Sequence, residues 1–284
     1  MSGFGALAQN YDGFILDLWG VVHDGYAPYP GVLDCLARLK KAGKRVVFLS
    51  NAPRRAAGIV KFLASLGVTP DLHDGVMSSG ESVYLGLKNR TDEFATLGRR
   101  LYHLGPPRDH DVFNTLDHVA TGNRLDYEVT NNPAEADFVL NTGPDDQLGP
   151  HEATLYRPTL EACLRAGLPM VCANPDLEVM KGDERIICAG YLAQIYEAEG
   201  GKVIQRGKPD PAIYTPTLAM LGTSKNRTIA VGDALRTDIA GAKAAGIDSC
   251  WVLSGIHALH PDQAPAEAAA AGLSPIAILP GLAW

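Results

Sequence analysis

The sequence predicts an α/β fold built on a parallel sheet, and three observations lead to that prediction. Short apolar runs rich in β-branched residues alternate with segments whose apolar residues recur at helical spacing. Glycines follow several of the helical segments, as is usual at the C-termini of helices. The alternation appears at both ends of the 284-residue chain and favours βαβ units.

The N-terminal part contains two strand–helix units. Residues 13–18 are typical of a short buried strand, and residues 30–42 follow with helical spacing up to a glycine. Residues 45–49, RVVFL, form a second β-branched run, and residues 54–66 predict a second helix closed by a glycine. Two such units in succession predict neighbouring parallel strands.

The C-terminal part repeats the pattern. Residues 211–221 and 238–245 predict helices, and residues 228–231 and 249–253 predict buried strands. The last stretch, residues 260–284, combines a short Ala-rich helix with Pro-rich loops, and we expect a surface appendage there.

The middle of the chain is less regular but contains its own elements. Strands are expected at residues 100–104, 138–140 and 170–173, and helices at residues 81–87 and 155–166. We therefore expect an inserted α/β module between about residues 80 and 188.

Composition limits the classes of function. Charged residues make up 20% of the chain and the net charge is −7, which argues against nucleic acid as the main partner. The five cysteines are widely spaced without a CxxC pair, which argues against a disulfide framework or zinc site and favours a cytoplasmic protein. No signal peptide or membrane span is expected, because the sequence lacks the apolar runs that they require.

Polar residues directly after apolar runs are the candidates for chemistry, because ligands bind beyond the carboxyl ends of parallel strands. The candidates are Asp17 after FIL, Ser50 and Asn51 after VVFL, Lys208 in QRGKPDPAIY, and Asp233 after TIAVG with Asp238 close behind. Each alone also fits a structural role, such as a helix cap, a turn or a solvated loop lysine. Together they suit phosphoryl chemistry, since a carboxylate can attack phosphorus while Mg²⁺ and a lysine offset the negative charge.

The sequence resembles the class IIA phosphatases of the haloacid dehalogenase (HAD) superfamily. ILDLWGVVHDG, VVFLSNAPRR, RGKPDPAIY and AVGDALRTDIAGAKAAGID resemble the four motifs of the superfamily in order. VMSSGES and VCANPDLEV resemble the segments where the cap of this class begins and where it approaches its end. The resemblance implies a Rossmann-like parallel-sheet core with an inserted α/β cap, with residues 1–79 and 189–284 in the core and 80–188 in the cap.

The resemblance also implies roles for individual residues. Asp17 would be the nucleophile that forms an aspartyl phosphate, and Lys208 would neutralise it and the phosphate. Ser50 and the backbone of Asn51 would bind the transferring phosphoryl group. The implied Mg²⁺ ligands are Asp17, Asp233, Asp238 and the backbone carbonyl of Trp19.

Trp19 departs from the pattern of the superfamily, which has an acid two residues after the nucleophile. That acid protonates the leaving group, whereas an indole N–H is only a hydrogen-bond donor. His23 and Asp24 are the nearby candidates for a substitute acid/base, and both also fit plain structural roles in packing and in a turn. We expect Trp19 to form an apolar wall for the leaving group.

The leading hypothesis is therefore a Mg²⁺-dependent phosphatase of small phosphorylated metabolites, such as sugar phosphates or nucleotides. The alternatives are a catalytically weak binding or regulatory protein with the same fold, and a phosphotransferase or C–X hydrolase on the same scaffold. The resemblance implies a homodimer formed through the cap. Candidates for specificity are residues 141–146 and 181–183 in the cap, and Arg54 and Arg55 after the second motif, where a solvated helix start is the structural alternative.

Overall fold

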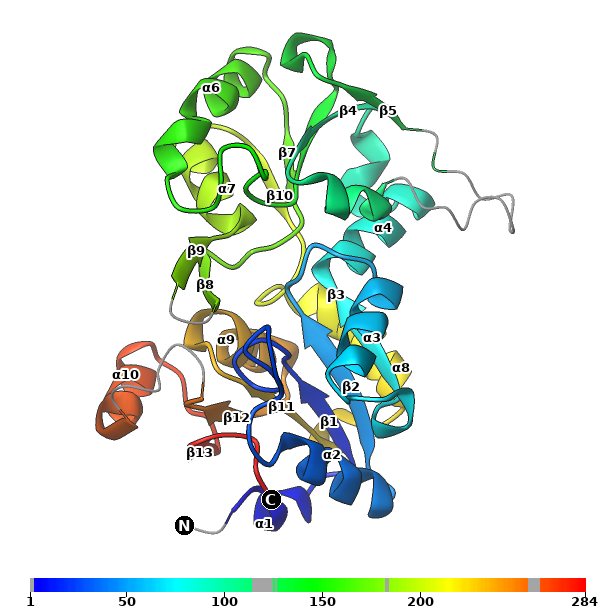
Figure 1. Ribbon diagram of the computed structural model, residues 1–284, viewed down its shortest axis with the longest axis vertical. Coiled ribbons are helices and arrows are strands. Elements are labelled where there is room, and N and C mark those ends of the chain that lie inside the picture. The colour runs from blue at the N-terminus through cyan, green and yellow to red at the C-terminus, as the bar shows by residue number, and fades with distance from the viewer. Residues whose placement is uncertain (1–2, 114–124, 126, 182–183, 255–260) are drawn as a thin grey trace.

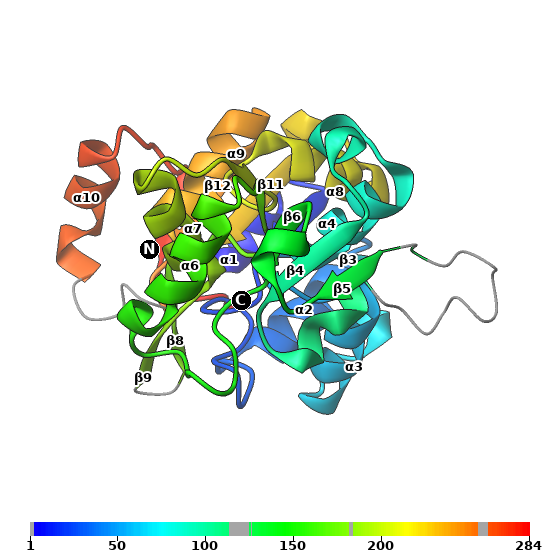
Figure 2. The ribbon, with the colours of Figure 1, turned by 90° about the horizontal axis from the view of Figure 1, so that it is seen from above.

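The computed structural model describes residues 3–284 apart from 114–124, 126, 182–183 and 255–260. It contains two parallel sheets, one above the other, each with helices on both faces (Figure 1). Seen from above, the elements of the upper sheet lie over those of the lower one (Figure 2). The predicted fold class, an α/β Rossmann-like core with an inserted α/β module, is confirmed.

The lower sheet has six parallel strands, and we call it the core sheet. In spatial order they are β13 (Ala277–Leu279), β12 (Asp248–Val252), β11 (Thr228–Gly232), β1 (Gly13–Leu16), β2 (Arg45–Ser50) and β3 (Gly75–Ser78). The helices of this half are α1 (Phe4–Ala8), α2 (Val32–Lys41), α3 (Ala56–Ser65), α8 (Tyr214–Leu221), α9 (Ala240–Ala245) and α10 (Ala264–Ala270).

Alternating side chains of the core strands bury both faces of the core sheet. Phe14 packs on the side that α2 and α3 cover, whereas Ile15 packs with residues of α8 and α9 on the other side. Strands covered on both faces are expected to be apolar throughout, as the fully buried β1 is. This burial holds the carboxyl ends of β1, β2 and β11 side by side.

The upper sheet has five parallel strands, and we call it the second sheet. In spatial order they are β10 (Val203–Gln205), β7 (Met170–Cys172), β6 (Phe138–Asn141), β4 (Arg100–Leu104) and β5 (Glu128–Thr130). Its helices are α4 (Ser79–Asn89), α6 (Arg157–Arg165) and α7 (Ala189–Ala198), and an antiparallel hairpin of β8 (Glu178–Lys181) and β9 (Glu184–Ile187) extends toward the core sheet.

The structure favours a later end of the inserted module than the predicted residue 188. Helix α7 packs into the apolar cluster of β6 and β7, and β10 pairs with β7, so both elements belong with the second sheet. We therefore propose that the inserted module runs from residue 80 to about residue 205, where β10 ends, instead of ending at residue 188. The sequence pattern did not predict β10, which has only three residues.

The predicted surface appendage at residues 260–284 is wrong for the last part of the chain. Strand β13 forms the edge of the core sheet, and Leu279 and Leu282 are buried in its apolar cluster. The physical reason is that β13 has a neighbour, β12, which supplies hydrogen bonds to a short strand that local pattern alone does not identify.

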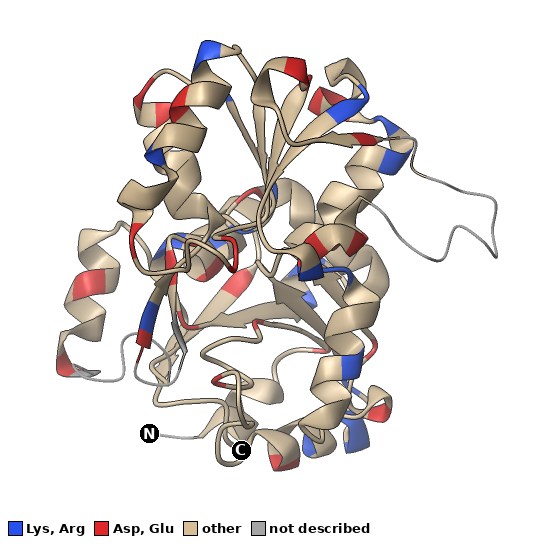
Figure 3. Ribbon diagram, turned by 45° about the horizontal axis from the view of Figure 1, so that its top comes forward, with Lys and Arg blue, Asp and Glu red and all other residues tan. Residues whose placement is uncertain are grey.

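Two further features concern the distribution of charged residues and the length of the helices. Figure 3 shows basic and acidic residues interspersed over both halves of the ribbon. Among the helices of the described residues, none is long and apolar enough to cross a membrane.

Candidate active site

Three predicted site residues lie where neighbouring core strands end. Asp17 directly follows β1, Ser50 is the last residue of β2, and Asp233 directly follows β11. Since β1 lies between β2 and β11 in one parallel sheet, these strand ends are adjacent. The backbone N–H of Asp17 donates to the carbonyl of Val231, 2.9 Å away. This hydrogen bond fixes the backbone of Asp17 against β11.

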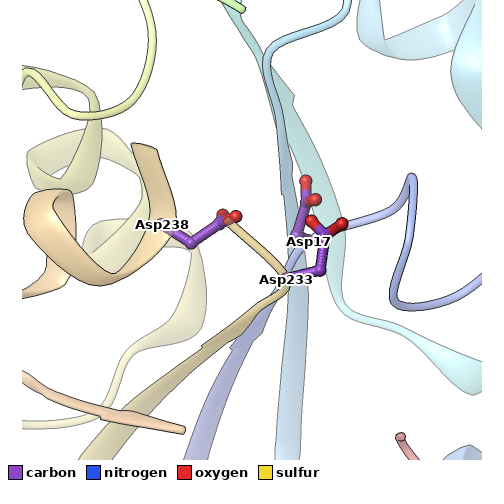
Figure 4. Close-up of side chains that lie close together, drawn as sticks. All are labelled: Asp17, Asp233 and Asp238. Carbon is purple, nitrogen blue, oxygen red and sulfur yellow. The ribbon is translucent and has the colours of Figure 1, made fainter. Parts of the chain in front are cut away.

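Asp238 completes a cluster of carboxylates. It lies in a π-helical turn, Leu235–Ile239, between β11 and α9, and Ala234 N–H donates to its Oδ2 over 3.1 Å. Ligand oxygens of Asp17, Asp233 and Asp238 all lie within 4.8 Å of one another, and the three carboxyl groups converge at the strand ends (Figure 4). All three residues are buried.

Lys208 provides positive charge to this cluster. Its Nζ donates to Asp17 Oδ1 and to Asp238 Oδ1, each 2.6 Å away, and only 3% of the lysine is exposed. Burial lowers the pKa of Lys208, but the two carboxylates outweigh that effect and raise it above its ordinary value. Lys208 is therefore a permanent cation between two buried acids.

The cluster fits a divalent metal ion. It offers oxygen ligands from three carboxylates, and one lysine does not balance their charge. Burial raises the pKa of Asp17 to about 7 even though Lys208 opposes the shift. A hard cation such as Mg²⁺ prefers this donor set and would supply the missing positive charge.

A glycine makes room for the carboxylate of Asp233. A Cβ on Gly20 would lie 2.2 Å from Asp233 Oδ2, and the residue has a φ of +83° that favours glycine. The indole of Trp251, from β12, donates to the backbone carbonyl of Asp233 over 2.9 Å and holds this loop from the other side.

Asn51 connects the two sheets through its side chain. Its Oδ1 accepts from the backbone N–H of Lys208 at 2.8 Å, and its Nδ2 donates to the carbonyl of Lys208 at 3.1 Å. The same Nδ2 also donates to Oδ1 of Asp176, 2.9 Å away in the loop after β7. The predicted contribution of Asn51 was its backbone, so this side-chain network is an additional finding.

Asp176 was not singled out by sequence reasoning. The available signal was its place in VCANPDLEV, four residues after β7 ends, where the loops of the second sheet approach the core sheet. Burial raises the pKa of its carboxyl above the ordinary value, while Lys208 and the hydrogen bond from Asn51 oppose that shift.

The candidates for a substitute acid/base have other partners. His23 Nδ1 accepts from the N–H of Gly25 at 3.0 Å, and burial lowers its pKa to about 4. Its ring makes edge contacts with Trp19 and Phe62. Asp24 Oδ1 accepts from the backbone N–H groups two and three residues ahead, the geometry of a turn residue.

Trp19 is partly buried, and its ring also lies against Gly25, where a Cβ would come within 2.6 Å of the indole. The Trp19 ring is therefore held between His23 and the turn that follows.

The predicted specificity residues are engaged within the protein. Arg54 forms an ion pair with the buried Asp109, and Arg55 pairs with Glu81 of α4. Asn141 is buried, its Nδ2 donating to the carbonyl of Ala189 over 3.0 Å. Of the other predicted segment, residues 182–183 lie outside the described residues.

Two family models match the sequence of this chain. The model of the haloacid dehalogenase-like hydrolases matches residues 14–118, and a second model described as HAD-hydrolase-like matches residues 205–279. The chain belongs to the haloacid dehalogenase superfamily. Within it, the similar proteins and structures include phosphatases of class IIA, as the resemblance indicated.

Two relatives of this HAD protein illustrate the similarity. It is 28% identical over 255 residues to the D-glycerol 3-phosphate phosphatase of Mycobacterium tuberculosis, covering 89% of this chain and 65% of that protein. It is 26% identical over 248 residues to the sugar-phosphatase AraL of Bacillus subtilis, covering 86% of this chain and 83% of that protein. The chain thus spans about two thirds of the mycobacterial relative and most of AraL.

A solved structure extends the likeness over nearly the whole HAD chain. The crystal structure of a haloacid dehalogenase-like hydrolase from Brucella suis 1330 superimposes with a TM-score of 0.82 at 29% identity, covering 98% of both chains. The similarity therefore includes both sheets and not only the core.

Proposed function

We propose that the protein is a Mg²⁺-dependent phosphatase of small phosphorylated metabolites, such as sugar phosphates or nucleotides. The observation that carries this proposal is the pair of hydrogen bonds from Lys208 to Asp17 and Asp238 within a cluster of three carboxylates. A carboxylate held by a lysine beside a cation site suits attack on phosphorus. The two relatives are a D-glycerol 3-phosphate phosphatase and a sugar-phosphatase, which supports the same class of substrate here.

The proposed residues each have one task. The Asp17 carboxylate attacks phosphorus and forms an aspartyl phosphate, which water later hydrolyses. Ser50 and the backbone after it hydrogen-bond the phosphoryl oxygens, and Lys208 balances their charge. Mg²⁺, held by Asp17, Asp233, Asp238 and the backbone carbonyl of Trp19, would supply further positive charge to the phosphoryl oxygens.

Trp19 removes the acid that the superfamily places beside the leaving group. Loss of a positioned acid costs about 10²–10⁴-fold in rate unless another group supplies the proton, and the cost is smallest where the leaving group departs without a proton. We propose that Trp19 provides an apolar wall for the leaving group. The second candidate function is a catalytically weak binding or regulatory protein, which the absence of an acid at position 19 favours.

Two further properties remain predictions: the cytoplasmic location, and a homodimer formed through the module of the second sheet. They rest on the cysteine pattern and on the resemblance to the HAD superfamily.

The proposed function is tested by measuring phosphate release from aryl and alkyl phosphates with and without Mg²⁺, using Asp17→Asn as the control. We expect turnover that needs Mg²⁺ and that Asp17→Asn abolishes. Thermal unfolding provides a second readout, since Mg²⁺ at about 100 times its Kd stabilises the folded state by about 2.7 kcal/mol. Asp233→Asn should reduce that stabilisation. If the wild-type protein is no more active than Asp17→Asn on any substrate, the result supports the alternative of a binding or regulatory protein.

A further inference from the structure

The inference concerns the proton that a departing alkoxide needs, and it rests on the proposed function. Trp19 occupies the position where the superfamily has its acid, and its indole N–H does not transfer a proton. His23 uses Nδ1 to accept a hydrogen bond and has a lowered pKa, and Asp24 is held in a turn. An alkoxide leaving group would therefore need a proton from another titratable group close to the nucleophile.

The carboxyl group of Asp176 lies at the candidate active site but is not part of the cluster of Asp17, Asp233 and Asp238. Its Oδ1 accepts from Asn51 Nδ2, and the same amide group donates to the backbone carbonyl of Lys208, whose Nζ bonds Asp17. The Asp176 carboxyl thus lies one side chain away from the lysine that holds the nucleophile. Its place next to Asn51 puts it beside the proposed phosphoryl site.

The backbone around Asp176 is fixed on both sides. Asn174 Oδ1 accepts from the N–H of Asp176 at 3.0 Å, and the N–H of Gly190 donates to its carbonyl at 3.1 Å. Arg236, from the turn that carries Asp238, donates to the carbonyl of Pro175 at 2.6 Å. Catalytic groups need this kind of support, because small displacements reduce proton transfer.

Asp176 also lies on the side of the site where the leaving group is expected. In phosphoryl transfer the attacking and leaving oxygens are roughly in line on opposite sides of phosphorus. Asp17 attacks from the end of β1, so the leaving group faces away from that strand. The loops of the second sheet, one of which carries Asp176, lie on that side (Figure 1).

We propose that Asp176 is the general acid and base of this protein, in place of the residue that Trp19 replaces. As Asp17 attacks, the bond from phosphorus to the leaving oxygen breaks, its electron pair stays on that oxygen, and the Asp176 carboxyl transfers its proton there. The resulting Asp176 carboxylate then takes a proton from water as the water oxygen attacks phosphorus. The bond to Asp17 breaks, which restores the Asp17 carboxylate, releases phosphate and leaves Asp176 protonated again.

The charge environment of Asp176 agrees with this role. Burial raises the pKa of its carboxyl and favours the protonated acid, although Lys208 and Arg236 oppose the shift and Asp238 adds to it. A neutral carboxyl still accepts the hydrogen bond from Asn51 through its carbonyl oxygen.

The test is the dependence of rate on the leaving group in Asp176→Asn. Asparagine keeps an acceptor for Asn51 but transfers no proton. Across aryl phosphates from 4-nitrophenyl to phenyl phosphate, we expect a small loss with the best leaving group. With the poorest one the loss should approach about 10²–10⁴-fold. Asp176→Glu should retain part of the activity with poor leaving groups, and Trp19→Asp combined with Asp176→Asn should recover it.

Matched measurements separate the outcomes. Glu161→Gln alters an exposed carboxylate of α6 beside the second sheet, paired with Arg165, and should leave the leaving-group dependence unchanged. An equal loss across the whole series in Asp176→Asn, or no loss, would overturn the role of Asp176. The proposed function fails separately, if the wild-type protein releases no more phosphate than Asp17→Asn even from 4-nitrophenyl phosphate.

Discussion

The two sheets have similar architecture but use the residues at their strand ends differently. At the core sheet, Asp17 and Asp233 converge with a lysine in a buried ionic cluster. At the second sheet, Asn141 and Asn174 each accept a hydrogen bond from a backbone N–H two residues ahead in their own loops. Neutral amides can satisfy local backbone groups, whereas buried carboxylates need cations. The carboxyl end of a parallel strand therefore becomes a charged site only where acids from several strands meet.

Removal of the lysine should disturb the core sheet most. Lys208→Met leaves Asp17 and Asp238 buried without their shared cation, and breaking such a pair costs about 3–5 kcal/mol. We expect a loss of that order in the free energy of unfolding, measured with urea, and loss of phosphate release. Mg²⁺ should restore part of the stability, since it supplies positive charge to the same carboxylates.

The control for this change is Lys61→Met, which removes an exposed lysine of α3 and should alter neither quantity. If Lys208→Met unfolds at the same urea concentration as the wild-type protein, the ionic cluster does not stabilise the core sheet. Loss of activity without loss of stability would then place the lysine in catalysis alone.

The difference between the sheets also explains what the sequence could predict. Asp17, Ser50 and Asp233 were predictable because each ends an apolar strand, and Lys208 and Asp238 because they lie in motifs of the superfamily. The contact between Asn51 and Asp176 joins residues 125 positions apart and depends on how the two sheets approach each other. Local pattern carries no information about such an approach.

The same reasoning applies to the fold. Strands β1, β2, β11 and β12 were predicted within one or two residues, because long apolar runs flanked by glycine or polar residues mark them. The three-residue strands β10 and β13 were missed, since their pairing with β7 and β12 decides their conformation. Their positions changed the proposed extent of the inserted module and the expected role of the C-terminal stretch.

A substitution in α7 should disturb the second sheet while leaving the ionic cluster intact. A Cβ on Gly190 would lie 2.4 Å from the carbonyl oxygen of Pro175 and 2.5 Å from that of Asp176. Gly190→Ala must therefore displace the loop that carries Asp176, at a cost of about 1–3 kcal/mol. We expect a steeper leaving-group dependence, like that of Asp176→Asn, in a protein that still binds Mg²⁺.

Gly58→Ala is the matched control, because its Cβ, in the first turn of α3, would lie 3.9 Å from Asp111 Oδ2, the nearest described atom outside the helix backbone. It should be neutral or stabilise the protein by about 0.5–1 kcal/mol. Equal leaving-group dependence in Gly190→Ala and Gly58→Ala would mean that the loop tolerates displacement without affecting proton transfer.

The smallest expected effect is an acid sensitivity in the second sheet. Burial lowers the pKa of His103, whose ring lies against His110 and Phe113, to about 3 from its ordinary value near 6.5. The unfolded chain then binds a proton that the folded protein does not, so this contribution to stability is complete above pH 6.5 and is lost as the pH falls toward 3. Burial raises the pKa of Asp109 to about 6, so its contribution to stability changes with pH in the opposite direction. That contribution is the same in the wild-type protein and in the variant. His103→Gln should therefore show a smaller drop in Tm between pH 7 and pH 5, and an identical drop would mean that His103 does not determine the acid sensitivity.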